Sequence, residues 1–378
     1  MPASLAEIAD SFFRPSVQSL VPYEPGKPVE EVQRELGLER CVKLASNEGP
    51  FGPFPTALEA MERSFAELNR YPDGGAWRLR RALAERYGVA FEEVAVGAGA
   101  DGIVDCLSQA TLEPGDVVVC GWPSFPSYVI DALKLGATAQ QVPLREHRYD
   151  LEAMLEAIGP RTKLVYVCHP NNPTGTTNTR AELDAFLDVV PGHVLVVVDQ
   201  AYREYVDDPA YPDAVEEYYK AGRAVAVLRT FSKIYGLAGL RVGYMIAPPE
   251  VVLAVNKVKR AFDVSSVAQE AALASLEGAA AEIERRRRVN TEGMVVLGQA
   301  LRDNGLEPAG PAVANFLFAE TGGDARPLFE ALLAEGVIVR PLHGFGAPEV
   351  IRVTCGTPDE NAFFAAALAR ARASVPTR

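Results

Sequence analysis

The chain has 378 residues, of which 48% are hydrophobic and 23% charged, and its formal net charge is −13. This length is too great for one compact core and favours two closely packed domains. The acidic balance, with no long run of lysine or arginine, argues against a nucleic-acid-binding protein. No apolar run approaches the roughly 20 residues that a membrane-spanning helix needs.

Cysteine and histidine usage argues against a disulfide framework and against a metal site. The five cysteines are scattered, odd in number and without a CxxC pair, and the four histidines are equally scattered. This pattern is typical of a reducing compartment. The N-terminus shows no basic region followed by an apolar one, so we expect no signal peptide and a cytoplasmic protein.

In chain order, residues 1–40 are rich in proline and show no clear core. We expect them to form an N-terminal arm that packs with a smaller domain, made from both ends of the chain. Residues 41–262 are expected to form a large domain, because short valine-rich runs alternate there with helical patterns. Nearly continuous apolar runs favour strands covered on both faces, and we predict them at 94–96, 117–120, 163–168, 194–199, 224–229 and 242–246.

Helical patterns near 101–110, 125–135, 151–158 and 180–190 lie between these runs. Strand–helix–strand alternation indicates an α/β fold, with a mostly parallel sheet between helices and right-handed crossovers. The pattern changes near residue 262. A long helix is predicted at 279–304, strands at 315–319, 337–340 and 350–354, and a closing helix from Asp359. Residues 263–378 are therefore expected to form a smaller α+β domain.

The densest basic run, residues 285–288, falls within the long predicted helix. We expect it to form a solvated helix face.

The first segment with chemical meaning is 94–102, where a predicted strand enters glycines and then a helix. Glycine allows close approach of the backbone, and a helix N-terminus offers free N–H groups to an anion such as phosphate. Gly97, Gly99 and Gly102 also fit the dinucleotide pattern GxGxxG. That alternative needs an acid at the end of the next strand, and Asp116 stands before that strand instead. An ordinary tight turn stays open for this segment taken alone.

The second segment is Pro-Asn-Asn-Pro-Thr-Gly at 170–175, directly after a predicted strand. Its prolines and glycine fix an irregular loop at the carboxyl end of the sheet, where ligands of open α/β sheets bind. Asn172 could hydrogen-bond a polar ring substituent there. The same residue types also occur in ordinary turns.

Two further strands end in polar groups. The apolar run 194–198 is followed directly by Asp199, and Tyr202 comes three residues later. A buried carboxylate needs a cationic or hydrogen-bonding partner, although an aspartate capping a helix would fit as well. The next strand leads to Lys233, which a pocket could desolvate into a nucleophile. Thr230, Ser232 and Arg241 nearby supply hydroxyls and a guanidinium suited to a phosphate.

Taken together, these segments resemble the fold-type-I aminotransferase family, whose enzymes use pyridoxal 5′-phosphate (PLP). The resemblance rests on 170–175, on Asp199 with Tyr202, and on Ser232-Lys233 with 239–241, in this order and rough spacing. It covers essentially the whole chain. The segments 23–28, 44–48 and 70–74 are most similar to histidinol-phosphate aminotransferases and their aromatic aminotransferase relatives.

The resemblance implies a role for each matching position on the cofactor ring. Lys233 would hold PLP as a Schiff base and then move the substrate proton. Asp199 would pair with the pyridine nitrogen, and Asn172 and Tyr202 would hydrogen-bond the phenolic oxygen. Phe125 would stack on the ring face.

The same resemblance implies a cradle for the cofactor phosphate and a site for the substrate anion. The backbone of Ala100 and Asp101, with Thr230, Ser232 and Arg241, would hold the phosphate. Tyr71 would reach that phosphate from the neighbouring subunit, which implies a homodimer with shared active sites. Arg352 would grip the substrate anion, with Tyr23 and Arg340 as additional contacts.

Three departures from the family pattern stand out. Gln200 occupies a position that often carries glutamate, Phe125 one that often carries tyrosine, and 47–50 is irregular. None removes a catalytic group, and phenylalanine keeps the aromatic face needed for stacking.

The expected reaction is transamination from a small amino donor to a 2-oxo acid, with histidinol phosphate and 2-oxoglutarate favoured. An aromatic amino acid, phenylalanine or tyrosine, is the main alternative donor. More distant alternatives are a PLP decarboxylase of a phosphoamino acid, an NAD-dependent dehydrogenase resting on GxGxxG, and a non-catalytic regulator.

Overall fold

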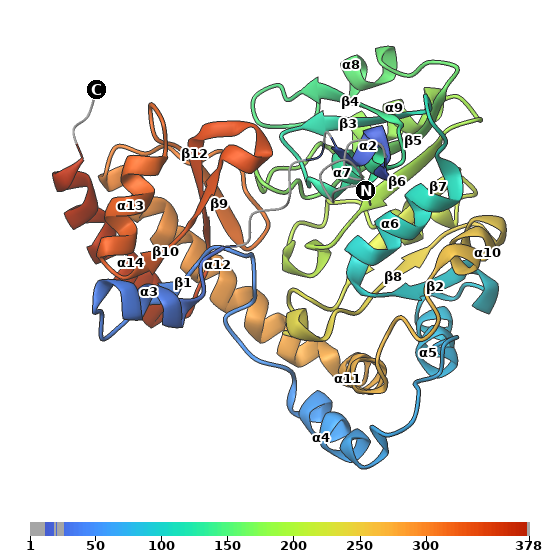
Figure 1. Cartoon of the computed structure of the whole chain (residues 1–378), viewed down its shortest axis with the longest axis horizontal. Helices are drawn as coiled ribbons and strands as arrows, with labels where there is room; N and C mark the ends of the chain where they lie inside the picture. The colour runs from blue at the N-terminus through green and yellow to red at the C-terminus, as the bar shows by residue number, and fades with distance from the viewer. Residues whose placement is uncertain (1–11, 19, 21–25, 376–378) are drawn as a thin grey trace, which may run out of the picture.

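The computed structural model describes residues 12–18, 20 and 26–375. A seven-stranded sheet forms the larger part of the molecule (Figure 1). Its order is β2-β8-β7-β6-β5-β3-β4, with β2 (Val94–Gly97), β3 (Val117–Trp122), β4 (Thr138–Pro143), β5 (Thr162–Cys168), β6 (Leu195–Asp199), β7 (Val225–Thr230) and β8 (Gly243–Ile246). The neighbours from β7 to β4 are parallel, whereas β8 is antiparallel to both β7 and β2.

The mixed, mostly parallel sheet confirms the predicted fold class. The predicted strands become β2, β3, β5, β6, β7 and β8, because their apolar runs are buried on both faces. The sequence did not predict β4. This edge strand reads Thr-Ala-Gln-Gln-Val-Pro, and only Val142 is buried, so it carries no apolar run.

Helices cover the sheet (Figure 1). The four predicted ones become α6 (Gly99–Thr111), α7 (Ser127–Lys134), α8 (Leu151–Glu156) and α9 (Arg180–Val189). Four others, α4 (Pro55–Ser64), α5 (Trp77–Tyr87), α10 (Pro249–Val258) and α11 (Ser266–Leu276), were not predicted. Among the described residues, no helix is long and apolar enough to cross a membrane.

The C-terminal part contains a three-stranded antiparallel sheet, β11-β12-β9. Its elements are α12 (Ala279–Asp303), β9 (Phe316–Glu320), α13 (Arg326–Ala334), β10 (Val337–Ile338), β11 (Arg340–Leu342), β12 (Ala347–Thr354) and α14 (Pro358–Ser374). The single strand predicted at 337–340 is two strands. β10 pairs with β1 (Val42–Lys43), whereas β11 pairs with β12.

Part of the N-terminal segment joins this C-terminal part. In α3 (Val29–Leu36), Val32 is buried together with Ala45, Leu333 and Ile338. The hydrophobic cluster around the large sheet continues past residue 262 and includes Ile283, Ala314 and Phe316. The exact division at residue 262 therefore stays a prediction.

The predicted long helix is α12, but the expectation that its basic run forms a solvated face is wrong for one residue. Arg286 is only 5% exposed, because this turn of α12 packs against two loops of the large part. Arg285 and Arg288 are exposed, as expected.

Two buried glycines in α12 allow a matched stability test. A Cβ at Gly293 would lie 2.4 Å from Cys355 Sγ and 2.6 Å from Asn361 Nδ2, whereas at Gly298 it would meet only the flexible end of Arg302, at 3.3 Å. Alanine gains about 1 kcal/mol of helix propensity at either site, but overpacking costs about 1–3 kcal/mol. Urea unfolding should therefore show Gly293→Ala below wild type and Gly298→Ala equal or above it. The opposite order would contradict this packing.

Candidate active site

A pocket of about 880 Å³ opens where the carboxyl ends of β5, β6 and β7 meet the N-terminus of α6. Parallel strands bring polar residues that are distant in sequence to one edge of the sheet, which is where α/β proteins bind ligands. The pocket is lined by most of the residues singled out from the sequence, namely Ala100, Asp101, Phe125, Asn172, Asp199, Tyr202, Thr230, Ser232, Lys233, Arg241, Arg340 and Arg352.

Asp199 is the last residue of β6 and is 4% exposed. Its Oδ2 accepts a hydrogen bond from the Tyr128 hydroxyl at 2.6 Å, and its Oδ1 accepts one from the Ala201 N–H at 3.0 Å. Burial raises the pKa of Asp199, although the Tyr128 bond acts in the opposite direction. A buried carboxylate of this kind favours a cationic partner in the pocket.

Lys233 follows β7 in an irregular turn and is partly exposed to the pocket. Its Nζ donates to the Asn47 carbonyl at 3.1 Å and lies 5.3 Å from the centre of the Tyr202 ring. Desolvation by burial, with the positive charge of Arg352 as the next cause, lowers the pKa of Lys233 to about 7. A large fraction of this amine is therefore neutral at physiological pH and can act as a nucleophile or base.

The Tyr202 hydroxyl and the Asn172 NH₂ group are two hydrogen-bond donors available to the pocket, because the oxygen atoms of both side chains already accept hydrogen bonds from protein groups. Asn47 Nδ2 donates to the Tyr202 hydroxyl at 2.9 Å, so the Tyr202 oxygen acts as an acceptor there and keeps its own O–H for another partner. The oxygen of the Asn172 amide accepts from Arg352 at 2.5 Å, which leaves the Asn172 NH₂ as the pocket-side group. Such a pair suits an acceptor that carries negative charge.

A concave anion site lies at the start of α6. Gly99 has φ +77°, and a Cβ there would lie 2.7 Å from Arg241 Nη2. A Cβ at Gly243 would lie 2.5 Å from the Ala100 nitrogen. Both positions therefore require glycine if the backbone and the Arg241 guanidinium are to lie this close together.

Hydroxyl groups complete this anion site. Arg241 Nη1 donates to Ser232 Oγ at 3.3 Å, and Ser232 Oγ also accepts from Thr230 Oγ1 at 3.0 Å. The first-turn N–H groups of α6, including those of Ala100 and Asp101, have no intrahelical acceptors. The combination of a helix N-terminus, hydroxyls and a guanidinium is suited to a phosphate.

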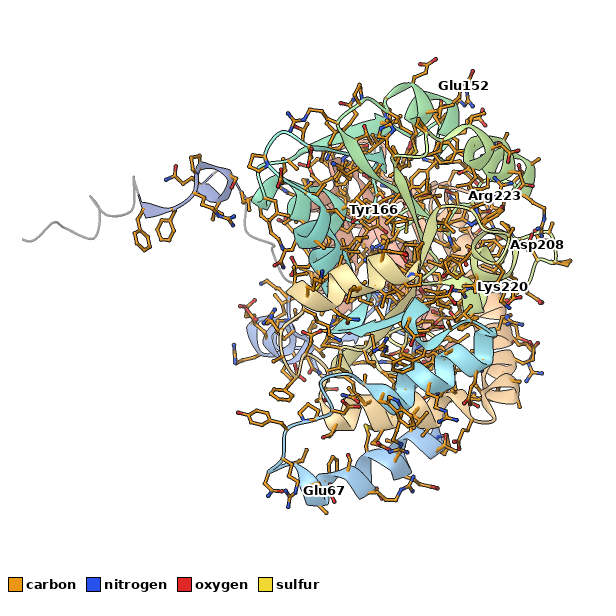
Figure 2. The ribbon with its side chains drawn as sticks, turned by 90° about the vertical axis from the view of Figure 1, so that its right-hand side faces the viewer. Glu67, Glu152, Tyr166, Asp208, Lys220 and Arg223 are labelled. Atoms are coloured by element: carbon orange, nitrogen blue, oxygen red, sulfur yellow. The ribbon has the colours of Figure 1, made fainter. Side chains whose placement is uncertain are left out.

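Phe125 lines the pocket between these polar groups, with its ring edge-on to Tyr128 at a centroid distance of 5.5 Å. The Tyr128 ring stacks on Tyr166 at 4.2 Å, inside the body of the protein (Figure 2). Phe125 is therefore held by a stack of aromatic rings and can offer an aromatic face to a planar ligand.

The opposite wall of the pocket is basic and comes from the C-terminal part. Arg340 and Arg352 are direct neighbours across β11 and β12. Arg352 is 5% exposed and donates to the Ala45 carbonyl at 2.9 Å, while Arg340 is less deeply buried. Two guanidinium groups on one wall can bind an anionic substrate.

Tyr23, which the sequence also singled out, lies outside the described residues. Tyr71 is 81% exposed and stacks on Phe262 at 4.5 Å. Within the described part of the chain, Tyr71 is not among the residues that line the pocket.

The sequence alone did not identify Asn47 and Tyr128. Asn47 is buried with φ +54°, and it contacts Tyr202, Asn172 and Lys233. An asparagine next to a Gly-Pro segment was the available signal, since asparagine tolerates positive φ. Tyr128 lies in the first turn of α7, three residues after Phe125, but nothing in the local sequence indicates that it reaches Asp199.

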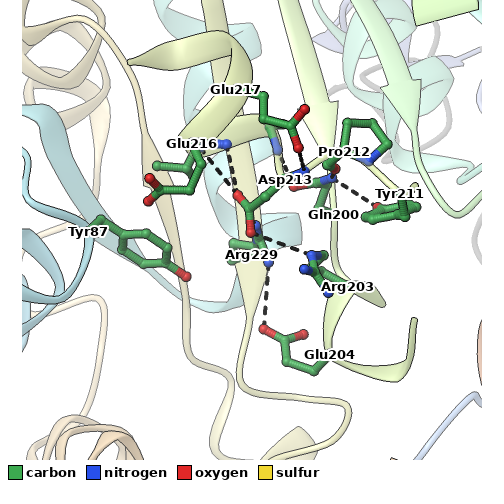
Figure 3. Close-up of polar contacts among 12 residues, drawn as sticks. Tyr87, Gln200, Arg203, Glu204, Tyr211, Pro212, Asp213, Glu216, Glu217 and Arg229 are labelled. Carbon is green, nitrogen blue, oxygen red and sulfur yellow. Dashed lines mark hydrogen bonds and ion pairs between the residues drawn. The ribbon is translucent and has the colours of Figure 1, made fainter. Parts of the chain in front are cut away.

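A buried charge network supports the segment that carries Asp199 and Tyr202 (Figure 3). Arg229, 2% exposed, donates to Asp213 at 3.0 Å and faces Glu204 at 3.8 Å. Gln200 donates to the Tyr211 hydroxyl at 2.9 Å and to the Pro212 carbonyl at 2.8 Å. A glutamate at residue 200 could not donate to that carbonyl, so this contact depends on the amide of Gln200.

Among the described residues, no group of three or more histidine, cysteine, aspartate or glutamate side chains could hold a metal ion. The chemistry of the pocket is carried by an amine, a carboxylate, hydroxyls and guanidinium groups.

The fold and the pocket are those of an α/β enzyme that binds its ligand at the sheet edge. The chain belongs to the aminotransferase class I and II family, whose family model matches residues 39–368. The chain is 47% identical over 356 residues to a histidinol-phosphate aminotransferase of Moorella thermoacetica, covering 94% of this chain and 92% of that protein. A histidinol-phosphate aminotransferase of Akkermansia muciniphila is 46% identical over 356 residues, covering 93% and 96%.

A solved structure agrees with these sequence relatives. The histidinol-phosphate aminotransferase from Sinorhizobium meliloti, in complex with pyridoxal-5′-phosphate, superposes with a TM-score of 0.86 at 30% identity. The match covers 97% of this chain and 99% of that one. Membership of this family excludes the dehydrogenase alternative that rested on GxGxxG.

Tyr128 and Tyr166 allow a test of the Asp199 environment. The folded-state pKa of Asp199 is raised, so this carboxyl destabilises the fold increasingly as pH rises above its unfolded value of about 3.9. Tyr128→Phe removes a donor to the ionised form and raises that pKa further. The loss of unfolding free energy should therefore grow with pH, reaching about 1.5–3 kcal/mol near neutrality.

Urea unfolding of the cofactor-free chain, from about pH 4.5 to pH 8.5, measures this loss. Tyr166→Phe is the control, because the Tyr166 hydroxyl lies beside Ser108 and its loss should not depend on pH in this way. A Tyr128→Phe penalty that stays constant over the range would contradict the assignment.

Proposed function

We propose that this chain is a PLP-dependent aminotransferase that moves an amino group between histidinol phosphate and 2-oxoglutarate. The relatives named above support this substrate. The observation that carries the proposal is the meeting of Lys233, with a pKa of about 7, and buried Asp199 in one pocket that also holds an anion cradle.

The pocket fits the functional groups of PLP. Asp199 offers a buried anion to the pyridine nitrogen, and Asn172 and Tyr202 offer two donors to the phenolic oxygen. Phe125 offers a ring face, and the cradle at Gly99, with Ser232 and Arg241, offers donors to the phosphate. When bound, PLP supplies an electron sink for the carbon that loses its proton.

The side chains of this protein do the rest of the chemistry. Neutral Lys233 Nζ accepts the proton from the substrate α-carbon, and its lowered pKa places it near the optimum for a base at neutral pH. The Asp199 carboxylate holds the proton on the pyridine nitrogen, which makes the ring a stronger acceptor of electrons. The Tyr202 hydroxyl and the Asn172 amide orient the ring without taking up the transferred proton.

The basic wall accounts for the use of two different substrates in one pocket. Histidinol phosphate carries a phosphate and no carboxylate, whereas 2-oxoglutarate carries two carboxylates. We propose that Arg340 and Arg352 bind the anionic group of each, because a guanidinium can pair with either kind of anion in bidentate fashion. Tyr23 is proposed as a further contact on the strength of the family resemblance.

The substrate assignment is tested by comparing kcat/KM for histidinol phosphate and for phenylalanine, each with 2-oxoglutarate, on chain reconstituted with PLP. We expect a preference for histidinol phosphate, and we expect Arg340→Gln to lower kcat/KM for it by about tenfold or more, the equivalent of losing one charge-assisted hydrogen bond of about 1.5–3 kcal/mol. Lys220→Ala, an exposed lysine at the molecular surface (Figure 2), is the control.

A preference for phenylalanine would instead identify an aromatic aminotransferase, with Arg352 binding the α-carboxylate. Activity with neither donor would contradict the proposed reaction.

We further propose a homodimer with shared active sites. Tyr71, which the family resemblance assigns to the phosphate of the neighbouring subunit, is exposed, as are other apolar side chains near it in the sequence, among them Phe65, Leu68 and Trp77. Several exposed apolar side chains in one segment of the chain support a subunit interface there. We propose the cytoplasm as its location, because the five cysteines are free thiols, as in reducing compartments.

Complementation tests both Lys233 and the shared site. Lys233→Ala should be inactive and should not be labelled when PLP and borohydride are added, and Tyr71→Ala should bind PLP more weakly. At a PLP concentration too low to fill the sites of Tyr71→Ala alone, an equal refolded mixture of the two variants should recover roughly a quarter of wild-type activity, because half of the dimers then hold one intact site. If the mixture forms dimers but recovers no activity, the shared site is contradicted. If PLP and borohydride still label Lys233→Ala, the role of Lys233 is contradicted.

A further inference from the structure

Arg286 is a buried arginine near the start of α12, outside the pocket residues. Its helix, α12, runs from the large part of the molecule towards the C-terminal part (Figure 1). Its side chain is 6% exposed, although it belongs to a run of four arginines whose other members reach solvent to differing degrees. Burial of a guanidinium is costly unless its donors are satisfied, so its partners indicate what holds it there.

The guanidinium joins two backbone segments of the large part. Nη1 donates to the Ile234 carbonyl at 3.0 Å, and Nη2 donates to the Gly52 carbonyl at 2.8 Å. The group also lies 4.5 Å from the centre of the Phe54 ring, an arrangement that favours a cation. Ile234 directly follows Lys233, so one of these bonds acts on the turn that carries the reactive lysine.

The two segments are in tight contact at this point. Gly236 has φ +71°, and a Cβ there would lie 2.4 Å from the Gly52 carbonyl oxygen. A Cβ at Gly49 would lie 3.0 Å from the Lys233 carbonyl oxygen. The two segments therefore lie too close together for a side chain at either glycine, and Arg286 donates to one backbone carbonyl on each of them.

A salt bridge alone does not explain the burial of Arg286. Its Nε donates to Glu282 at 2.8 Å. Exposed Arg285 pairs with the same carboxylate through two bonds, at 2.8 and 2.7 Å. Glu282 would therefore keep a cationic partner without Arg286, whereas the carbonyls of Ile234 and Gly52 would lose theirs.

We propose that Arg286 is a positioning residue that fixes the turn 233–236 against the loop 47–52 and thereby sets the place of the Lys233 amine. This inference rests on the proposed function in one respect, namely that Lys233 is the reactive lysine. The planar fork of arginine reaches two carbonyls and a carboxylate at once, which a lysine ammonium cannot do with the same geometry.

Arg286→Gln and Arg286→Lys test the proposal, with Arg285→Gln as the matched control. Competitive acetylation of the cofactor-free full-length chain, read by mass spectrometry, gives the pH at which Lys233 becomes reactive. Arg352, Glu48, Arg241 and Asp199 are the charged groups that face Lys233, and all remain in these variants. Wild type should show an inflection near pH 7, in line with a Lys233 pKa of about 7.

In Arg286→Gln the inflection should move upwards, towards the ordinary lysine value of about 10.4, because water reaches the amine when the turn relaxes. Arg286→Lys should show a smaller shift, and Arg285→Gln none. The holoenzyme should lose about tenfold or more in kcat for Arg286→Gln, as expected from a displaced catalytic group. Thermal melting shows which variants are folded.

A folded Arg286→Gln with the same inflection as Arg285→Gln would overturn the proposal. If Arg286→Gln does not fold, an unshifted Arg286→Lys would overturn it. If the variants show the expected shifts of the Lys233 inflection but the wild-type holoenzyme transaminates no donor, the positioning role is supported and the proposed function is overturned. Normal transamination with unshifted variants would overturn the positioning role alone.

Discussion

Burial of the Asp199 carboxylate at the end of β6 constrains most of what surrounds it. Removal of a charged group from water costs several kcal/mol unless its partners replace the lost hydration. Tyr128 and the Ala201 N–H supply two hydrogen bonds, yet the pKa of Asp199 remains raised by burial. A cation beside this carboxylate would offset that cost, and in the proposed function the protonated pyridine ring of PLP is that cation.

Burial and neighbouring charges also determine the pKa of Lys233, but here burial lowers the pKa instead of raising it. Burial and the positive charges of Arg352 and Arg241 favour the neutral amine, whereas Glu48 and Asp199 favour the charged one. Burial is the largest cause of the lowered Lys233 pKa, and Arg352, which belongs to the basic wall, is the next. In the proposed function this wall also binds the substrate, so a charge change at Arg352 is expected to alter both substrate binding and the reactivity of Lys233.

The sequence predicted what local pattern controls, and missed what tertiary contact controls. Buried strands such as β5 and β6 are continuous apolar runs, and the polar residues that end them identified the pocket. The strand β4 was missed because an edge strand has little apolar sequence. Asn47, Tyr128 and Arg286 were missed because their importance depends on partners more than 50 positions away, and an arginine in a basic run looks like any solvated one.

The pairing of β1 with β10 joins Val42 to Val337, and this has a consequence for biosynthesis. A ribosome releases the N-terminal segment long before its partner strand exists, and domains fold as units during synthesis. The large sheet can assemble first, but 26–45 must wait, with Val32 and Ala45 unburied, until β10 (Val337–Ile338) has emerged. The wall that carries Arg340 and Arg352 is built at the same stage, so the proposed substrate site forms only after β10, β11 and β12 have emerged.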